Sequence, residues 1–383
     1  RLTGPRNARP MNAVTAVGNR AMALSAPGPS ATTMPPDEAS RKPVVPTHVP
    51  RKLAQDPVFL AAARHYLLMH TTSGRWRLGL ALALTTAVFW GLLPIALKIT
   101  LAGMDAWTLT WYRFATASVA LGLFLAWRRR LPLRSPLTRH GWWLYAAALL
   151  GLVANYVSYL VSLELTGPTA AQVLIQLAPM FLLFGGLVVF RERFAPLQWA
   201  GFAVLVTGLG VFFHDRIADV FAIETRLGLG VAIMLFSAVV WAGYALAQKQ
   251  LLTQLASEQV LFLLYLGAVP LLLPPAHLAQ LLTLDGLQLG MLAFCCANTV
   301  IAYGCFAEAL EHWEVSRVSA VVTLAPIFTV LGVHAAAWVW PDAAPAEALS
   351  GWNLLGAALV VGGSMTTALG ARSRAAPSAL PVD

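Results

Sequence analysis

The chain has 383 residues, of which 58% are hydrophobic and only 11% are charged, and its mean hydropathy is +0.68. A soluble domain needs far more polar surface than this composition supplies, so the sequence excludes a soluble globular enzyme or binding module. The net charge of +9 does not indicate nucleic-acid binding, because residues 1–77 hold eleven Lys and Arg against three Asp and Glu, whereas residues 78–383 hold fifteen against fourteen.

Residues 1–77 form a basic segment that also holds ten of the 24 prolines. Such a composition cannot bury a core, so we predict a disordered N-terminal tail on the cytoplasmic side. The tail contains no RNP, zinc-finger or Walker pattern, and it lacks the apolar stretch of a secretory signal. Met69 stands directly before the basic lead into the first apolar segment. Translation from Met69 would leave residues 1–68 outside the native protein, and the sequence is compatible with either start.

Ten apolar segments follow, each near the length of about 20 residues that a helix needs to cross a bilayer. They run over residues 78–98, 107–127, 141–163, 169–190, 197–214, 228–249, 257–273, 287–308, 316–338 and 351–370. The connections are short, which favours antiparallel neighbouring helices. The expected fold is an all-α polytopic membrane protein with ten transmembrane helices, followed by a C-terminal cytoplasmic tail over residues 371–383.

Lys and Arg in the loops predict the orientation, because cytoplasmic loops carry an excess of both. The inner loops are then residues 128–140, 191–196, 249–256 and 309–317, and the outer loops are residues 99–106, 164–168, 215–227, 274–286 and 339–350. The inner loops and the C-terminal tail hold eleven Lys and Arg, whereas the outer loops hold two, Arg216 and Arg226. Both termini are therefore expected in the cytoplasm.

The second half of the apolar region repeats the first. Equivalent pairs are Trp90 and Trp241 at an offset of 151, Tyr156 with Tyr303 and Pro179 with Pro326 at 147, and Gly201 with Gly356 and Gly208 with Gly363 at 155. Five helices are an odd number, so the second copy enters the membrane from the opposite side. We predict two inverted five-helix repeats, residues 78–214 and 228–370, an architecture typical of transporters that alternate access around a midplane site.

Prolines and small residues predict how these helices bend and pack. Pro94, Pro179 and Pro326 lie inside apolar segments, where a proline removes a hydrogen bond and kinks a helix. Two symmetric bends around a central space and kinks that only serve packing are both compatible with Pro179 and Pro326. Segments five and ten are rich in glycine, which predicts a scaffold or a homodimer contact. These glycines are Gly201, Gly208, Gly210, Gly356, Gly362 and Gly363.

Polar and aromatic side chains on segments one, three, four, six and eight predict a shared cavity, because polar groups inside a membrane mark substrate pathways. The predicted substrate-binding residues are Trp90, Asn155, Tyr159, Gln172, Gln176, Trp241, Tyr244, Asn298 and Tyr303. Aromatic rings would form the walls and amides would orient the substrate. Each residue also has a structural alternative, since Asn and Gln join helices and Trp and Tyr mark membrane interfaces.

Three cations are predicted to gate the cavity or to attract an anionic group: Lys98, Arg113 and Lys249. Both lysines lie at helix ends, from which they could also snorkel to water. Arg113 lies about six residues into the second segment and needs a partner there. Asp105 and Glu164, on the same predicted side, are the candidates.

No paired carboxylates and no His or Cys metal set lie within the apolar segments. Cys295, Cys296 and Cys305 share one segment without a disulfide or metal spacing. We therefore expect no enzymatic activity, no metal and no cofactor.

Four stretches carry a family resemblance: FWGLLPIALK (residues 89–98), WYRF (111–114), ELTGPTAAQVLIQLAPMF (164–181) and RERFAPLQWAGFAVLVTGLGV (191–211). In this order they resemble the drug/metabolite transporter superfamily, and within it the ten-helix EamA-type transporters. The resemblance covers residues 78–370. The family usually has an acidic position after helices four and nine. Glu192 fits it, and in the second copy the acidic residue is either absent or displaced to Glu347.

The resemblance implies a multi-pass transporter of the bacterial inner membrane that exports a small metabolite, such as an amino acid, by alternating access. Proton coupling is expected, and a facilitator without coupling is the alternative mechanism. A nucleotide-sugar-like or other organic-solute facilitator and a non-transporting membrane scaffold or sensor are the alternative functions. Because this fold hosts many substrates, substrate, direction, coupling ion and oligomeric state stay open at this stage.

Overall fold

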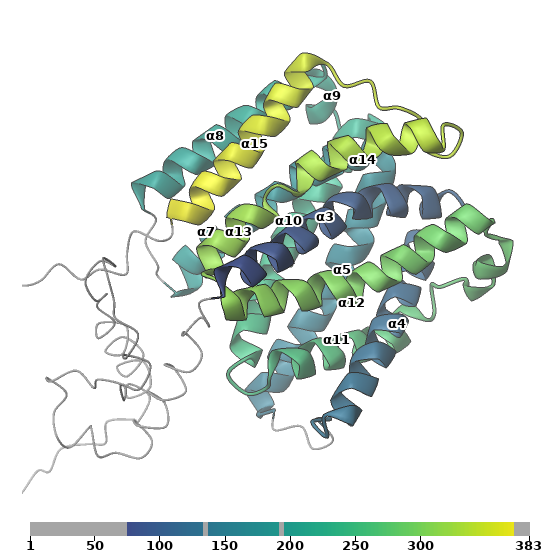
Figure 1. The fold of residues 1–383 in the computed structure, drawn as a ribbon, viewed down its shortest axis with the longest axis vertical. Coiled ribbons are helices and arrows are strands. Elements are labelled where there is room, and N and C mark those ends of the chain that lie inside the picture. The colour runs from purple at the N-terminus through teal and green to yellow at the C-terminus, as the bar shows by residue number, and fades with distance from the viewer. Residues whose placement is uncertain (1–74, 133–136, 191–194, 371–383) are drawn as a thin grey trace, which may run out of the picture. The chain divides into compact units, whose positions relative to one another are not determined.

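The computed structural model describes residues 75–132, 137–190 and 195–370, apart from the side chains of residues 186–190, and all regular structure in these ranges is helical (Figure 1). The first half contains α3 (Trp76–Leu101), α4 (Ala106–Trp127), α5 (Arg139–Thr166), α6 (Pro168–Leu174), the 3-10 helix η3 (Ile175–Leu177), α7 (Ala178–Phe190) and α8 (Pro196–Phe212). The second half contains α9 (Ile217–Phe221), α10 (Arg226–Leu251), α11 (Ser257–Leu272), the 3-10 helix η4 (Leu278–Thr283), α12 (Gly286–His312), α13 (Val315–Val322), α14 (Ala325–Val339) and α15 (Gly351–Gly370). The all-α prediction is confirmed for the described residues. Most of the predicted N-terminal tail, the C-terminal tail and Glu192 lie outside them.

Helical structure is present at each of the ten predicted segments. Eight helical stretches in the described ranges are long and apolar enough to cross a membrane. The apolar helices α8 and α11 have 17 and 16 residues. At 1.5 Å per residue they would extend over about 24–26 Å, somewhat less than the hydrocarbon thickness of about 30 Å. Two predicted loops also contain the short helices α9 and η4, which a search for apolar segments of spanning length does not detect.

Side chains satisfy free backbone N–H groups at several helix starts. The capping residues are Asp105 for α4, Thr138 for α5, Thr225 for α10 and Asp285 for α12. Helix α5 ends at Thr166 and is followed by Gly167, whose φ of 90° favours glycine. Pro168 then starts α6, where its missing N–H costs nothing.

The fourth and ninth predicted segments are each divided at repeat-equivalent positions. Helix α7 begins at Ala178 after η3, and α14 begins at Ala325 after α13 ends at Val322. In both cases the proline is the second residue of the new helix, Pro179 or Pro326, where the absent N–H breaks no intrahelical bond. The structure therefore shows a helix start where a kink was predicted. Pro94, by contrast, lies inside the continuous helix α3.

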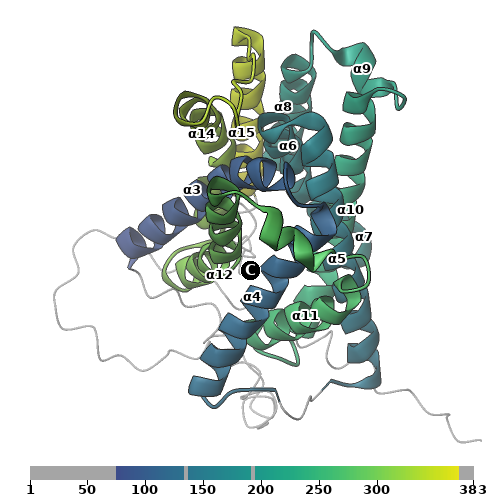
Figure 2. The same ribbon diagram turned by 90° about the vertical axis from the view of Figure 1, so that its right-hand side faces the viewer.

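Packing between helices repeats when the two halves are exchanged. Helix α3 packs against α12 as α5 packs against α10, and α3 packs against α14 as α7 packs against α10. The pairs α8 with α15 and α4 with α11 join equivalent helices. These two pairs lie at opposite edges of the bundle (Figures 1 and 2).

The crossing of α8 and α15 reproduces this exchange at the level of single atoms. A Cβ atom on Gly208 would lie 2.9 Å from the carbonyl oxygen of Gly356, and one on Gly363 would lie 2.6 Å from that of Gly201. The two contacts are equivalent, because Gly363 is the counterpart of Gly208 and Gly201 is the counterpart of Gly356, each at an offset of 155 residues. Two further glycines of these helices have no heavy atom within 4 Å of the Cβ position, Gly210 and Gly362. Four glycines of the predicted small-residue face thus pack within the chain.

Interhelical hydrogen bonds follow the same rule. Ser237 Oγ of α10 donates to the carbonyl oxygen of Asn155 in α5 at 3.1 Å. Thr86 Oγ1 of α3 donates to the carbonyl oxygen of Ala302 in α12 at 3.3 Å. Thr86 and Ser237 differ by 151 positions and Asn155 and Ala302 by 147, which are the offsets read from the sequence.

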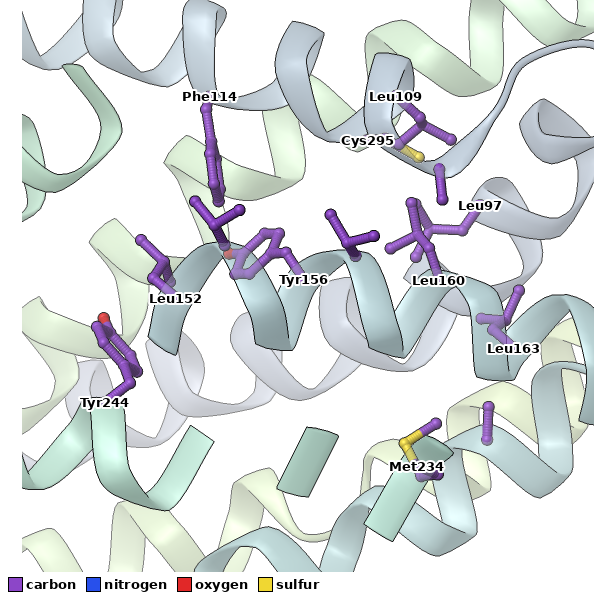
Figure 3. Close-up of a cluster of buried hydrophobic side chains, with 14 of the residues drawn as sticks. Leu97, Leu109, Phe114, Leu152, Tyr156, Leu160, Leu163, Met234, Tyr244 and Cys295 are labelled. Atoms are coloured by element: carbon purple, nitrogen blue, oxygen red, sulfur yellow. The ribbon is translucent and has the colours of Figure 1, made fainter. Parts of the chain in front are cut away.

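An apolar cluster surrounds α5 and holds the two halves together (Figure 3). Phe114 and Leu109 of α4 lie on one side of α5 with Cys295 of α12, and Met234 and Tyr244 of α10 lie on the other. Burying this surface between elements far apart in the chain favours the compact bundle through packing, since lipid itself supplies no hydrophobic force between helices.

Candidate functional site

Three side-chain contacts join residues that are equivalent between the two halves. Tyr156 Oη donates to Tyr303 Oη at 3.2 Å. The rings of Phe114 and Tyr265, 151 positions apart, lie with centroids separated by 5.0 Å. Each contact joins a residue to its own counterpart in the other half. These contacts therefore define a centre at which the two halves meet.

The third contact joins the two broken helices. Gln176 in η3 donates its Nε2 hydrogen to the carbonyl oxygen of Thr323, at 3.1 Å. Thr323 lies between α13 and α14 and 147 positions after Gln176. The carbonyl groups near such a break lose helical partners, so a buried amide there has an evident structural use.

Arg113 lies beside this centre and is almost completely buried, with 3% of its surface exposed. Its Nε donates to Thr299 Oγ1 at 3.1 Å, and its guanidinium carbon lies 4.8 Å from the centroid of the Tyr156 ring. Thr299 Oγ1 in turn donates to the carbonyl oxygen of Cys295, so the hydroxyl oxygen faces the guanidinium as an acceptor. Arg113 is thus held by a ring face and one neutral oxygen.

The predicted acidic partners of Arg113 are wrong. Asp105 caps α4 and lies 3.3 Å from His277 Nδ1, and Glu164 is exposed while its carbonyl oxygen accepts a hydrogen bond from Lys98 Nζ at 3.1 Å. Asp105 is used as the N-cap of α4, and Glu164 is exposed to solvent at the end of α5. Arg113, in contrast, is the eighth residue of α4 and is buried in the bundle.

The side chain of Asp105 has a perturbed pKa outside the membrane-spanning helices. Its partial burial acts to raise the pKa, but hydrogen bonds from Thr108, His277 and Trp107 to the carboxylate outweigh burial and lower it. The carboxylate form therefore stabilises the start of α4.

Five of the predicted substrate-binding residues lie at or around the central contacts. Trp90 meets Tyr303 edge to face with centroids 5.3 Å apart, and Tyr159 Oη donates to Gln172 Oε1 at 3.3 Å. Gln176 is described above. These residues come from α3, α12, α5, α6 and η3, which agrees with the prediction that several helices contribute polar groups to one region.

The two predicted asparagines instead join helices. Asn155 Nδ2 donates to the hydroxyl and the carbonyl oxygen of Ser237, and Asn298 Nδ2 donates to the carbonyl oxygen of Phe89 at 2.6 Å. Tyr244 is buried against Gly151, and Trp241 packs partly buried against the apolar cluster. These contacts give all four residues a structural use, and their contact with substrate stays a prediction.

Both predicted lysines occupy the last turn of their helices. Lys98 lies at the end of α3, bonded to the Glu164 carbonyl oxygen, and Lys249 is exposed at the end of α10. Glu347 Oε1 accepts from the backbone N–H of Thr169 at 3.5 Å, so this carboxylate lies at the turn between α5 and α6.

Thr299, Thr323 and Tyr265 belong to this centre, and the sequence interpretation missed them. The repeat offsets would have found two of the three, because Thr323 is the equivalent of Gln176 and Tyr265 that of Phe114. No signal marks Thr299, since its equivalent is Leu152. In the described ranges no three His, Cys, Asp or Glu side chains gather as a metal ion would require.

The sequence model of the EamA-like transporter family matches the chain twice, over residues 77–213 and 228–369. The chain belongs to this family. The resemblance to EamA-type transporters is thereby confirmed, and the protein is a multi-pass membrane transporter of the drug/metabolite type. Members of the family are transporters and not enzymes.

Relatives of this EamA protein are named as transporters. An "Uncharacterized transporter" of Haemophilus influenzae is 39% identical over 293 residues, which cover 76% of this chain and 95% of the relative. The "Uncharacterized inner membrane transporter YhbE" of Escherichia coli K12 is 39% identical over 296 residues, covering 77% and 92%. A "Probable amino-acid metabolite efflux pump" of the same strain is 26% identical over 310 residues, covering 77% and 96%.

A solved crystal structure has a similar fold. It superposes with a TM-score of 0.54 at 22% identity and covers 79% of this chain and 100% of its own. At this identity the likeness shows the shared fold alone.

Proposed function

We propose that this EamA transporter exports a small metabolite, such as an amino acid, across the bacterial inner membrane by alternating access. The observation that carries the proposal is the set of central contacts between equivalent residues: Tyr156 with Tyr303, Phe114 with Tyr265 and Gln176 with Thr323. A site on the axis between two equivalent halves is exposed to either side when the halves rock against each other. The amino-acid metabolite named for the 26% identical relative supports the substrate class.

The proposed architecture is ten membrane helices in two inverted repeats, residues 78–214 and 228–370. Contacts with α5 support the inversion. The C-terminal end of α3 reaches α5 where Lys98 bonds to Glu164, and the N-terminal end of its equivalent α10 reaches the same end of α5, where Gly230 adjoins Thr166. Because α3 meets this end of α5 with its C-terminus and α10 meets it with its N-terminus, the two equivalent helices run in opposite directions.

Loop contacts support the proposed sidedness. Asp105 and Gln280, in two loops predicted outside, are joined by a hydrogen bond of 3.0 Å. Thr138 and Gln254, in two loops predicted inside, are joined by one of 3.1 Å. Exposed tryptophans lie near helix ends, as membrane interfaces favour. They are Trp76, Trp107, Trp127, Trp142, Trp143, Trp199, Trp338, Trp340 and Trp352. Together with the excess of Lys and Arg on the inner loops, these features support the proposal that both termini lie in the cytoplasm.

A nucleotide-sugar carrier is the rival within transport, and it needs several cations to neutralise a pyrophosphate. In the described ranges Arg113 is the buried Lys or Arg, whereas Lys98 and Lys249 lie at helix ends. One interior cation favours a substrate with a single negative group or none.

Reconstitution tests the proposal directly. The full chain is placed in liposomes, and uptake of a radiolabelled amino-acid and metabolite panel is measured with and without a pH gradient. Stimulation by the gradient would identify proton coupling, and equal uptake in both would identify a facilitator. If no panel member is transported, the proposed function is unsupported.

Two substitutions test the site. Gln176→Ala removes the bond between the broken helices, and Trp241→Ala removes a proposed wall. Both are expected to lower transport without loss of membrane insertion. The control is Trp338→Ala, because Trp338 is 86% exposed at a helix end. Normal transport in both variants would place the substrate elsewhere.

A further inference from the structure

Arg113 has more hydrogen-bonding capacity than its surroundings use. A guanidinium carries five N–H donors. Among the described residues, the hydrogen bond that Arg113 donates is the one from Nε to Thr299 Oγ1. Within the described ranges the two Nη groups therefore have no hydrogen-bond acceptor, although only 3% of the surface of Arg113 is exposed.

The charge of Arg113 is also unbalanced. Every Asp and Glu in the described ranges lies in a loop, in a first turn or within the last two turns of a helix. None of them is within ion-pair distance of Arg113 in that part of the chain. An unpaired charge buried in a membrane protein is costly, and such residues mark substrate or ion pathways.

The fold itself does not require this cation. The contact between Phe114 and Tyr265 fixes the register of α4 against α11, so the position equivalent to Arg113 is Leu264. The partner Thr299 is likewise equivalent to Leu152. Both leucines are buried in the apolar cluster. Each set of equivalent positions takes one residue from each half. One set holds two leucines, and the other holds a cation with a hydroxyl acceptor.

We propose, building on the transport function above, that the free Nη face of Arg113 binds a carboxylate of the transported metabolite. A carboxylate accepts two parallel N–H bonds from a guanidinium, which satisfies both Nη groups and balances the charge. The ring of Tyr156 supports the guanidinium from one face, and Thr299 fixes its Nε. A phosphate ester carries about −1.5 to −2 charges, and a single guanidinium would leave it incompletely neutralised, so a monocarboxylate fits better.

Matched competitors test this assignment in proteoliposomes. Counterflow of radiolabelled L-leucine and L-phenylalanine is competed with 4-methylpentanoate, which keeps the carboxylate, and with 4-methylpentanamide, which lacks it. The acid is expected to compete on the order of 10- to 100-fold better, the range for hydrogen bonds to a charged group. Arg113→Leu, which copies the other half, should remove this difference, and Thr299→Val should reduce it several-fold. Arg216→Gln, at an exposed arginine paired with Asp219, is the control and should leave it unchanged. Equal competition by acid and amide in the wild type, or an unchanged difference in Arg113→Leu, would overturn the assignment.

A second measurement separates this inference from the transport proposal. The thermal unfolding midpoint of the purified full chain is compared in 4-methylpentanoate and in 4-methylpentanamide at equal concentration and ionic strength. The acid should raise the midpoint of the wild type by a few degrees more than the amide, and Arg113→Lys and Arg113→Leu should lose this difference partly and fully. A rise in the wild type without any transport would support the site and refute the transport proposal. Transport of panel members without a rise specific to the acid would refute the site and leave transport standing.

Discussion

The two halves of this EamA transporter use one packing scheme with different chemistry at its centre. Beside Tyr156 the first half places Arg113 against Thr299, whereas the corresponding positions hold Leu264 and Leu152. Glycine contacts, hydroxyl bonds and the broken helices are reproduced between the halves, but this pair is not. The shared features are those that packing demands, and the difference marks a residue that packing alone does not explain.

The largest effect on stability should come from placing a second arginine at Leu264, the position in the second half that corresponds to Arg113. Leu264→Arg would bury a second unpaired charge opposite Arg113, at a cost of about 2.5–3.5 kcal/mol for Arg at a helix centre. We expect a large loss of folded protein, measured by size-exclusion chromatography and thermal unfolding in detergent. Leu264→Met, which conserves volume, is the control and should cost less than about 1.5 kcal/mol.

Moving the charge sharpens the same comparison. In Arg113→Leu/Leu264→Arg the interior holds one cation again, so folded yield should recover toward the wild-type level. Yield as low as in Leu264→Arg alone would show that the two positions are not equivalent in their surroundings.

Substitutions at equivalent glycines of α8 and α15 should change the free energy of unfolding by equal amounts. Gly208→Ala and Gly363→Ala each push a Cβ against the backbone of the opposite helix and should lower the free energy of unfolding by similar amounts, about 1–3 kcal/mol. Gly210→Ala and Gly362→Ala, which meet no neighbouring atom, should leave stability unchanged or raise it. Unfolding titrations in detergent would measure this, and a large difference between Gly208→Ala and Gly363→Ala would contradict the equivalence of the two glycine contacts.

Capping of α4 and α11 differs between the halves. Asp105 caps α4 with its side chain, whereas its equivalent in α11 is Ala256, which has no side-chain cap. Asp105→Ala should destabilise the protein by about 1 kcal/mol, and Ala256→Asp should stabilise it by up to about that amount.

The contribution of Asp105 should depend on pH. Its pKa in the folded protein is lowered relative to the unfolded value of about 3.9. The added stability is therefore fully present above the unfolded pKa and is lost as the pH falls through the folded pKa. The stability difference between wild type and Asp105→Asn should shrink as the pH falls below about 4. A difference independent of pH in this range would show that the charge of Asp105 does not contribute.

The smallest effect concerns the hydroxyl pair on the axis. Tyr156→Phe and Tyr303→Phe each remove the same hydrogen bond, so the double variant should be less destabilised than the sum of the single ones. Hydrogen bonds between membrane helices couple by about 0.6 kcal/mol on average. A double-mutant cycle on unfolding free energies measures this coupling, and strict additivity would mean that the bond contributes nothing.

Much of the fold could be predicted from the sequence because it depends on local properties. Apolar runs located the ten helical segments, and the offset of 147 residues already related Tyr156 to Tyr303, whose hydroxyl groups form a hydrogen bond. Prolines located the divisions of segments four and nine, although whether Pro179 bends a helix or starts one depends on neighbours such as the amide of Gln176.

What composition, periodicity and repeats determined by themselves was a helical membrane protein of two related halves, because solvation by lipid constrains each segment independently of the others. The partner of each buried polar group was decided only by tertiary structure. Asp105 and Glu164 were reasonable partners for Arg113 by sidedness, yet the packing of α4 against α12 brought Thr299 to it and kept both carboxylates at helix ends. Which side chains meet across a bundle depends on helix rotation and crossing, and these are set by the sum of many close contacts that no single segment specifies.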